Sequence, residues 1–334
     1  MSNIVRVARA AGVSTMTVSR YFNDPGKLRP ETRARVEAAV DALQYVPNAA
    51  ARSLIHGRTD TLALIVADIT NPFFTTLARG VEDVAQQHGL TLILGNADET
   101  LAKERAYLGV MVARRVDGVI LSPAPGEGHN LGLLAGHRIP VVLIDRRIDG
   151  ADVDVVRGDS RAAGLLLTRH LIELGHRRIA FIGGPANVSS LEDRLAGYRA
   201  ALAEVGLPAS VHLGRYDRRS GEEIVAALAV SGNRLGCSAL VAANNAVAGG
   251  ALLALARLGL RVPGDVSLVC FEDFESDAIV DPFLTVVVQP AYEIGHRATS
   301  ILLDRIRGGS GAANDVVLPV TLLIRRSAAA PADN

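Results

Sequence analysis

Residues Val7 to Asn23 read VARAAGVSTMTVSRYFN, and this stretch decides how the N-terminal part of the chain folds. Gly12 breaks a helical pattern of apolar residues, and Ser14 follows where its side chain can cap a second helix. Val18 and the aromatic pair after it have the spacing of an inward face, which turns the other side chains of this helix outward. The outward set is Thr15, Met16, Thr17 and Arg20. The pattern predicts a helix-turn-helix with a DNA-reading second helix, although an ordinary helical hairpin shares it.

Basic residues are concentrated at the N-terminal end of a chain that is neutral as a whole. The chain has 35 Lys and Arg residues and 35 Asp and Glu residues. Residues 1–58 hold nine of the basic residues against four acidic ones, so this segment carries +5 and the remainder −5. A small cationic segment on an anionic body is typical of a module that meets phosphates. The charge distribution therefore favours DNA binding over the plain hairpin.

A third helix and a short linker follow the helix-turn-helix. Pro30 suits the first turn of a helix that continues to Leu43, and Pro47 prevents that helix from extending further. Residues 48–54 then read NAAARSL and have helical potential that ends at Gly57. Because isolated helices need about 12 to 15 residues to be even marginally stable, this one is expected to form only with a partner. A plain alanine-rich tether is the alternative.

From Thr61 onward, short apolar runs alternate with helical patterns, and the alternation restarts after Asp159. Runs of this kind are typical of strands buried on both faces of a parallel sheet. The expected strands are 62–67, 90–94, 118–121, 141–144, 179–182, 239–241 and 266–271. Helices are expected at 73–88, 101–114, 130–137, 162–174, 191–205, 221–231 and 244–258, with C-capping glycines at 89, 175, 206 and 259. The pattern predicts two successive lobes, each a doubly wound α/β sheet.

Motifs for catalysis, nucleotide binding or metal binding are absent from the sequence. It has no G-x-G-x-x-G, G-x-x-x-x-G-K-[ST] or G-x-S-x-G, and its eight histidines lack metal-ligand spacing. We therefore expect no enzymatic activity, no cofactor and no metal site. Cys237 and Cys270 both lie in apolar runs, which does not indicate a disulfide. No signal-peptide core or apolar run of about 18 residues occurs, so a soluble cytoplasmic protein is expected.

Polar residues stand at the carboxyl ends of the expected strands. Asp68, Ser122 and Asp145 follow strands of the first lobe, and Glu272 with Asp273 follows a strand of the second. Open α/β sheets place their ligands at this end of the strands. The sequence therefore predicts a cleft that binds a small polar molecule.

Several blocks of the sequence, in this order, closely resemble the lactose/galactose repressor family of bacterial transcription regulators. They are VARAAGVSTMTVSRYFN, RPETRARV, YVPNAAARSL, DITNPFF, RRVDGVIL, LGHRRIAFIGG, RLAGYRAAL and LTVVVQP. The resemblance spans nearly the whole chain. It implies a homodimer that binds a pseudo-palindromic operator in double-stranded DNA. It also implies an α/β fold with an all-α helix-turn-helix headpiece and a two-lobed, doubly wound parallel-sheet domain similar to periplasmic sugar-binding proteins.

The expected domain division has three parts. Residues 1–46 form the headpiece, 47–58 a hinge helix or linker, and 59–334 the domain for effector binding and dimerisation. Within the last, the N-terminal lobe takes 59–158 and 291–318, and the C-terminal lobe takes 159–290 and 319–334.

The resemblance also carries site residues to this chain. Thr15, Met16 and Arg20 match base-reading positions, and Thr17, Ser19 and Asn23 match positions near phosphates. Leu54 matches a leucine that relatives insert into the minor groove, beside Ala51. In the effector cleft, Phe73 and Phe74 match wall positions, and the polar contact positions are Asp145, Arg194, Asn244, Glu272 and Gln289. Arg194 is the foremost candidate, because an arginine can hold hydroxyls or a carboxylate bidentately.

The chain departs from the family pattern near the cleft. Many relatives have Asp where this chain has Glu272, Gly where it has Cys270, and Asp where it has Asn245. The longer carboxylate of Glu272 shifts the acceptor by about one methylene. We expect a ligand-responsive transcription regulator, most simply a repressor. The alternatives are an enzyme or sugar-transport binding protein of the same architecture and a constitutive architectural DNA binder. The effector (pentose, hexose, sugar acid or nucleoside), its sign, and assembly beyond a dimer stay open.

Overall fold

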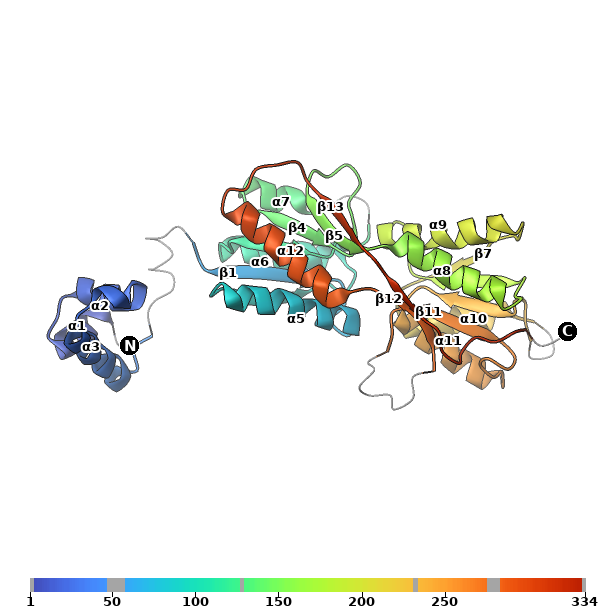
Figure 1. The fold of residues 1–334 in the computed structure, drawn as a ribbon, viewed down its shortest axis with the longest axis horizontal. Coiled ribbons are helices and arrows are strands. Elements are labelled where there is room, and N and C mark those ends of the chain that lie inside the picture. The colour runs from blue at the N-terminus through green and yellow to red at the C-terminus, as the bar shows by residue number, and fades with distance from the viewer. Residues whose placement is uncertain (1–2, 47–57, 127–128, 231–233, 275–282, 332–334) are drawn as a thin grey trace. The chain divides into compact units, whose positions relative to one another are not determined.

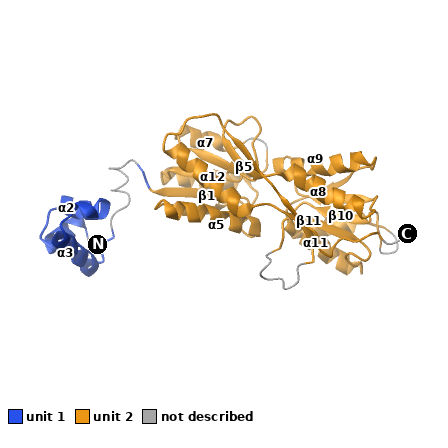
Figure 2. Ribbon diagram, in the orientation of Figure 1, with its two compact units in different colours: residues 1–59 blue, residues 60–334 orange. Residues whose placement is uncertain are grey.

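The fold was determined from a computed structural model, which describes residues 3–46, 58–126, 129–230, 234–274 and 283–331. The chain divides into two compact units, Met1–Thr59 and Asp60–Asn334 (Figure 2). The expected hinge helix, with Ala51 and Leu54, lies outside the described residues.

The first unit is a small helical domain. Its helices are α1 (Ile4–Ala11), α2 (Thr15–Asn23) and α3 (Pro30–Leu43), with a 3-10 turn η1 at Pro25–Lys27. Gly12 ends α1 at a φ of 63°, which suits glycine, and the Ser14 hydroxyl caps α2 by accepting from the backbone N–H of Thr17 at 3.1 Å. Val7, Val18 and Val36 are fully buried between the three helices. The predicted helix-turn-helix is confirmed.

The second unit holds two six-stranded sheets (Figure 1). The first sheet has the order β13-β5-β4-β3-β1-β2 and is parallel throughout. Its strands are β1 (Thr61–Val66), β2 (Thr91–Asn96), β3 (Gly118–Leu121), β4 (Val141–Ile144), β5 (Asp154–Gly158) and β13 (Asp315–Leu318). The second sheet has the order β14-β12-β11-β10-β6-β7 and is parallel except for β14. Its strands are β6 (Ile179–Gly183), β7 (Ser210–Leu213), β10 (Ala239–Ala242), β11 (Ser267–Phe271), β12 (Thr285–Val288) and β14 (Thr321–Leu323).

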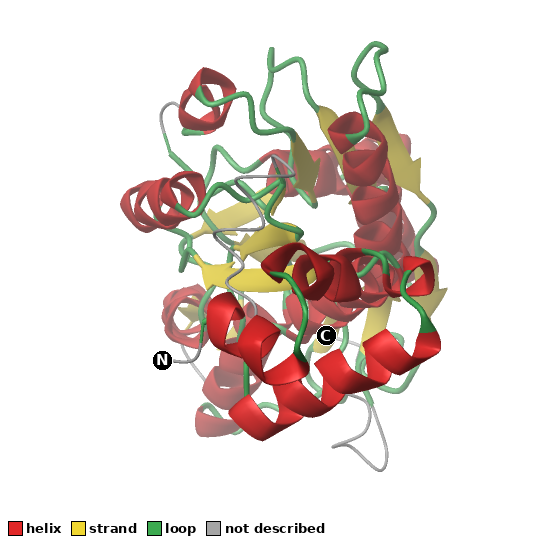
Figure 3. Cartoon of the chain, turned by 90° about the vertical axis from the view of Figure 1, so that its left-hand side faces the viewer, coloured by secondary structure: helices red, strands yellow, loops and turns green. Residues whose placement is uncertain are grey.

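Helices cover both faces of each sheet (Figure 3). The first sheet packs against α5 (Pro72–Gln87) and α12 (Ala291–Ile306) on one face, and against α6 (Leu101–Ala113) and α7 (Leu131–Gly136) on the other. The second sheet packs against α8 (Ser160–Glu173) and α9 (Ser189–Glu204) on one face, and against α10 (Arg218–Leu228) and α11 (Asn245–Arg257) on the other. We call these assemblies the first lobe and the second lobe. The predicted doubly wound α/β architecture is confirmed.

The chain passes between the lobes three times. It leaves the first lobe after β5, returns after β12 to form α12, and leaves again after β13, the last strand of the first sheet, to form β14 in the second. The three connecting segments lie between β5 and α8, between β12 and α12, and between β13 and β14. Each is only a few residues long, so the lobes are linked by a narrow hinge.

Most helix boundaries lie within two residues of the prediction, but one helix begins and ends three residues earlier. The helix expected at 221–231 ends at Leu228, because Ala229 adopts an extended conformation (φ −67°, ψ 132°). Ala229–Val230 then forms a short strand, β8, that pairs with β9 (Arg234–Leu235). The β-branched Val230 suits this strand better than it suits a helix end.

Reciprocal glycines bring three pairs of helices into close contact: α5 with α12, α8 with α9, and α10 with α11. A Cβ atom on any of these glycines would lie within 2.3 Å of a carbonyl oxygen on the partner helix. The pairs are Gly80 and Gly295, Gly164 and Gly197, and Gly221 and Gly250. A backbone carbonyl cannot move aside as a flexible side chain can. A larger residue at any of these glycines must therefore push the two helices apart.

Gly164→Ala is expected to destabilise the second unit by about 1 to 3 kcal/mol, the usual cost of overpacking. The added methyl would lie 2.1 Å from the carbonyl oxygen of Arg194 on α9. Gly109→Ala in α6 is the matched control, because its Cβ would meet no atom within 4 Å. That control should be neutral or slightly stabilising, since alanine favours helix over glycine by about 1 kcal/mol. Equal urea midpoints for the two variants would contradict the close contact.

Candidate functional site

The DNA-reading face predicted for α2 is largely exposed. Thr15, Arg20 and Asn23 are exposed, and 70% of Met16 is accessible. The first turn of α2 contains no acidic residue, so the positive end of the helix dipole is uncompensated there. An exposed, cation-bearing helix whose N-terminus is free of acids suits a phosphate-lined groove.

Two residues of this helix are less exposed than the sequence suggested. Thr17 is half-buried because its side chain joins the helix cap, where its hydroxyl lies 3.0 Å from that of Ser14. Thr17 is therefore only partly accessible on the outward face, and its place near a phosphate stays a prediction. Ser19 is also half-buried and accepts a hydrogen bond from the Asn23 amide at 3.3 Å.

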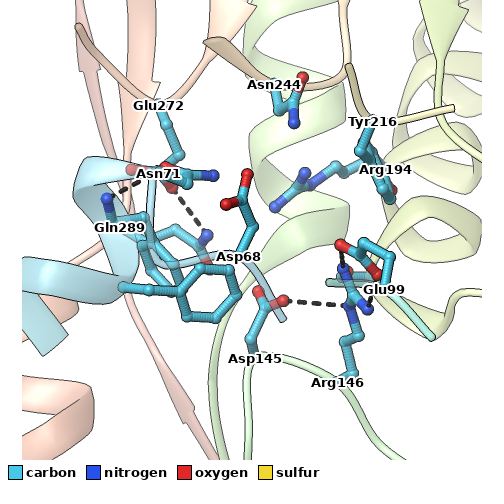
Figure 4. Close-up of a pocket in the computed structure, with 13 residues that line it drawn as sticks. Asp68, Asn71, Glu99, Asp145, Arg146, Arg194, Tyr216, Asn244, Glu272 and Gln289 are labelled. Carbon is cyan, nitrogen blue, oxygen red and sulfur yellow. Dashed lines mark hydrogen bonds and ion pairs between the residues drawn. The ribbon is translucent and has the colours of Figure 1, made fainter. Parts of the chain in front are cut away.

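A cleft between the two lobes contains all seven predicted effector residues (Figure 4). They are Phe73, Phe74, Asp145, Arg194, Asn244, Glu272 and Gln289. Six further residues line the same cleft: Asp68, Asn71, Glu99, Arg146, Ser190 and Tyr216. The cavity has a volume of about 30 Å³, enough for only one or two water molecules. The lobes are thus closed on each other, and a sugar ring can enter only if they separate.

Two carboxylates occupy equivalent positions in the two lobes. Asp145 directly follows β4 and Glu272 directly follows β11, and both adopt left-handed backbone conformations with φ of 64° and 66°. The amide of each still donates to the neighbouring strand, to the carbonyl of Val156 at 3.1 Å and of Val287 at 2.9 Å. Left-handed conformations are costly for residues other than glycine and cluster at functional sites. Here they occur where both side chains enter the cleft.

Burial changes the ionisation of both carboxylates. It raises the pKa of Glu272 to about 7, against the opposing effects of the Gln289 hydrogen bond and the charge of Arg194. It also raises the pKa of Asp145, although Arg146 and Arg194 act to lower it. Near neutral pH Glu272 is therefore divided between a protonated carboxyl group, which donates a hydrogen bond, and a carboxylate, which only accepts them.

The Glu272 pKa predicts a pH dependence of stability. Between its ordinary value of 4.5 and about 7, the folded protein binds more protons at Glu272 than the unfolded chain does. Its contribution to the free energy of unfolding therefore falls as the pH rises through this window, by up to about 3 kcal/mol. Glu272→Gln removes that contribution, so the variant should gain stability over the parent as the pH rises from 5 to 8.

Stability must be compared between parent and variant, because two histidines contribute a pH dependence of stability that has the opposite sign. Burial lowers the pKa of His170 and of His176, so their contribution to stability rises with pH. Urea titrations of both proteins at several pH values isolate Glu272. Parallel stability profiles for parent and Glu272→Gln would contradict its raised pKa.

Arg194 enters the cleft from the first turns of α9 and is 6% exposed. Its Nη1 donates to the carbonyl of Ala243 at 2.7 Å, and its guanidinium carbon lies 4.8 Å from the centre of the Phe271 ring. These contacts fix the group by a hydrogen bond and a cation–π interaction. Its Nε has no hydrogen-bond partner among the described residues.

Three other buried polar atoms of cleft residues share this condition. Within the described part of the chain, the Tyr216 hydroxyl, Gln289 Oε1 and Arg146 Nε have no hydrogen-bond partner, although Arg146 Nε lies 3.4 Å from Asp145 Oδ2. A buried polar group without a partner costs about 1 to 3 kcal/mol. Four such atoms in one cleft therefore indicate a place for a polar ligand.

Asp193, beside Arg194 on α9, ties the lobes together. Its Oδ2 accepts from Nη1 of Arg147 and, at 3.2 Å, from Nη1 of Arg157, two residues of the first lobe. The hydroxyl of Ser189 also accepts from the backbone N–H of Arg147 at 2.9 Å. These contacts hold the closed arrangement from the same helix that presents Arg194.

Asp193→Asn should therefore shift the lobes toward the open arrangement. Partly exposed ion pairs contribute about 1 kcal/mol or less, so the affinity for a ligand held by both lobes should fall about two- to fivefold. Small-angle scattering of the unliganded variant should show a larger radius of gyration. Asp149→Asn is the control, because Asp149 pairs with the same Arg147 but within the first lobe. A scattering profile for Asp193→Asn equal to that of the control would show that Asp193 does not hold the two lobes in the closed arrangement.

Asn245 makes a further contact between the lobes. Its Nδ2 donates to Asn71 Oδ1 at 3.3 Å and to the carbonyl of Asp273 at 3.1 Å. A carboxylate could donate neither bond. The amide at this position, where many relatives have Asp, therefore adds hydrogen bonds between the lobes and to Asp273 that an ionised Asp could not make.

Some cleft residues were missed from the sequence. Glu99 follows the edge strand β2, and Arg146 follows Asp145, so the rule of polar residues at strand ends could have found both. The two form a bidentate ion pair with N–O distances of 2.6 Å. Tyr216 follows β7, whose sequence SVHL is half-exposed at the sheet edge and lacks the apolar run of a central strand. The sequence around β7 therefore contains no pattern that predicts Tyr216 as a cleft residue.

Comparison with known proteins decides the family. A model described as "Bacterial regulatory proteins, lacI family" matches residues 3–48. A second, "Periplasmic binding proteins and sugar binding domain of LacI family", matches residues 59–326. The chain belongs to the LacI family. The resemblance inferred from the sequence blocks is thereby confirmed, and the protein is a DNA-binding transcription regulator.

Individual members of the LacI family resemble the chain over its full length. The transcriptional regulator GalR of Salmonella typhimurium LT2 is 36% identical over 338 residues, covering 100% of this chain and 98% of that protein. The structure of the regulator CelR in complex with cellobiose superimposes with a TM-score of 0.73 at 30% identity, covering 98% of this chain and 100% of that one. The lac repressor dimer bound to operator and the anti-inducer ONPF gives a TM-score of 0.85 at 26% identity, covering 98% and 99%.

The described residues contain no helix long and apolar enough to cross a membrane.

Proposed function

We propose that the protein is a repressor whose affinity for operator DNA is controlled by a small polar effector, sugar-like in character, bound between the lobes. The observation that carries the proposal is a set of buried atoms, among them Arg194 Nε, Tyr216 OH and Gln289 Oε1, that have no hydrogen-bond partner in the described part of the chain and lie in a cleft lined by both lobes. LacI-family relatives support it, since CelR was solved with cellobiose and the lac repressor as an operator-bound dimer.

The effector acts on the angle between the lobes. Asp145 and Phe73 belong to the first lobe, and Arg194 and Glu272 to the second, so a ligand that contacts all four fixes their relative orientation. The short connections between the lobes permit such a movement. A ligand with a tenfold preference for one arrangement supplies about 1.4 kcal/mol of coupling per bound molecule.

DNA binding is assigned to the headpiece, residues 1–46. Thr15, Met16 and Arg20 read bases, while Thr17, Ser19 and Asn23 lie near phosphates. The headpiece joins the effector domain, 59–334, through the hinge at 47–58. There Leu54 acts as a minor-groove wedge beside Ala51 when two copies of the chain bind a pseudo-palindromic operator as a homodimer. A change in the first lobe, which begins just after the hinge at Thr61, then reaches the hinge pair directly.

A two-step experiment tests this function. Thermal-shift screening of metabolites first identifies a ligand that stabilises the protein. Gel-shift titration with genomic fragments then measures operator affinity with and without it. We expect at least one fragment to bind with an affinity that the ligand changes severalfold. Retention of full DNA affinity at saturating ligand would contradict the proposal.

A further inference from the structure

Arg325 lies two residues beyond the end of β14 and holds the loop that follows β11. Its Nη1 donates to Asp273 Oδ1 at 2.9 Å, and its Nη2 donates to the other oxygen of the same carboxylate. Each side chain of this bidentate pair is only 18% exposed. Arg325 and Asp273 are not among the described residues that line the effector cleft. Any effect of the pair on the cleft must therefore be indirect.

Arg325 is itself fixed at further points. Its Nη1 also donates to the carbonyl of Leu284 at 3.1 Å. Its backbone N–H donates to Oγ1 of Thr285, the first residue of β12, at 2.9 Å, and the Thr285 hydroxyl lies 3.2 Å from the carbonyl of Arg325. A guanidinium with so little freedom holds the carboxylate that pairs with it in one position.

Asp273 directly follows Glu272, whose side chain enters the cleft. Glu272 has a left-handed backbone conformation, which is costly for a residue other than glycine and persists only where the surroundings enforce it. On one side, the backbone N–H of Glu272 donates to the carbonyl of Val287, and its Oε1 accepts from Gln289. On the other side lies Asp273, whose carboxylate Arg325 holds. The conformation that turns Glu272 into the cleft is thus fixed from both sides.

The main chain of Asp273 has a weaker contact of its own. Its carbonyl accepts from Nδ2 of Asn245 at 3.1 Å. Hydrogen bonds between ionised groups are about twice as strong as those between neutral ones, and the ion pair supplies two of them. The loss of Arg325 should therefore free Asp273 even though Asn245 remains.

On the basis of the proposed function, we infer that Arg325 is a positioning residue of the effector site, whose ion pair with Asp273 holds Glu272 in the cleft. Arg325 acts through Asp273 and does not touch the effector. The pair also connects the third passage between the lobes, which leads into β14, to a side chain that faces the effector. A role in overall stability alone would leave Glu272 in place when the pair is removed.

Hydrogen exchange on the unliganded full chain tests this role. We expect the backbone amide of Glu272 to exchange about tenfold faster or more in Arg325→Ala than in the parent, because its hydrogen bond to β12 opens once Asp273 can move. Rates are taken relative to amides in β10, which report on unfolding of the whole second lobe. Equal relative rates for Glu272 in Arg325→Ala and the parent overturn the positioning role.

Arg169→Ala is the matched control. Arg169 forms a bidentate pair with Glu204 in the same lobe, at the C-terminal end of α9. Its loss should leave exchange at Glu272 unchanged. Arg325→Lys keeps the positive charge but lacks the planar fork, so exchange at Glu272 should remain faster than in the parent. Full restoration of the parent's rate by lysine would show that charge alone is needed, and would overturn positioning by the bidentate pair.

A second readout follows the ionisation of Glu272. Asp273→Ala combined with Arg325→Ala removes the ion pair without leaving an unpaired carboxylate beside Glu272. Water then reaches Glu272 more easily, so the pH window in which Glu272→Gln gains stability should move down by about one unit or more. The control, Arg169→Ala combined with Glu204→Ala, should leave the window in place. Coinciding windows with and without the Asp273–Arg325 pair overturn the positioning role.

None of these measurements requires an effector or DNA. If Glu272 is displaced as expected and every metabolite in the thermal-shift screen fails to bind, the result counts against the proposed function alone. If a metabolite binds and changes operator affinity while Glu272 is undisturbed in Arg325→Ala, the positioning role alone is overturned.

Discussion

Arg194→Ala is expected to abolish the response of operator binding to the effector, while operator affinity without effector stays within a few fold of the parent. Among the described residues, Arg194 Nε has no hydrogen-bond partner, so it is open to a ligand in the cleft. Loss of a charged hydrogen-bonding group costs about 1.5 to 3 kcal/mol, so effector affinity should fall about 10- to 150-fold. If the natural ligand is a co-repressor, the same change leaves the protein permanently weak on DNA. Operator titration with and without ligand measures both quantities.

Arg199→Ala provides the control for that experiment. Arg199 lies on the same helix, α9, but its side chain is exposed. This variant should respond to effector as the parent does. Full ligand affinity and full response in Arg194→Ala would show that the cleft is assigned wrongly at its foremost residue.

Arg20→Ala is expected to weaken operator binding by about 1 to 3 kcal/mol, or roughly 5- to 150-fold, if Arg20 contacts guanine bidentately. It lies exposed in the second turn of α2, whose first turn contains no acidic residue. The loss should be larger on operator than on random DNA, and the base preference at one position should relax. Binding selections with randomised operators measure both effects. Equal losses on the two kinds of DNA would instead make Arg20 a phosphate contact.

Met16→Ala separates base reading from charge in the same assay. Methionine has no hydrogen-bond donor, and 70% of this side chain is accessible. Its substitution should change the preferred sequence and leave the salt dependence of binding unaltered.

The sequence predicts those parts of the fold that local chemistry determines. The helix-turn-helix follows from the spacing of Gly12, Ser14 and Val18, because a left-handed turn, a cap and a buried face each demand a particular residue type. Central strands such as β3 and β4 are apolar throughout, since both faces are covered. Their positions along the chain then indicate the edge at which polar residues gather.

Features that depend on distant partners are not predictable from local patterns. In the sequence, Gly164 and Gly197 resemble weak points of two helices, and only the fold shows each one facing the other helix's backbone. The tie between Asp193 and two arginines likewise depends on lobe closure. Tyr216 was missed because its strand lies at a sheet edge, where the apolar run is lost. The effector residues were found because the resemblance named them, and that they bind ligand stays a prediction.

Coupling between cleft and DNA is tested most directly by measuring the effector dissociation constant twice, by calorimetry, on the free protein and on the protein saturated with operator. Thermodynamic linkage requires that the effector change operator affinity by the same factor as the operator changes effector affinity. We predict that the two dissociation constants differ by at least tenfold, and by the factor seen in operator titrations. Equal dissociation constants in the presence and absence of operator would contradict control of DNA binding by the cleft.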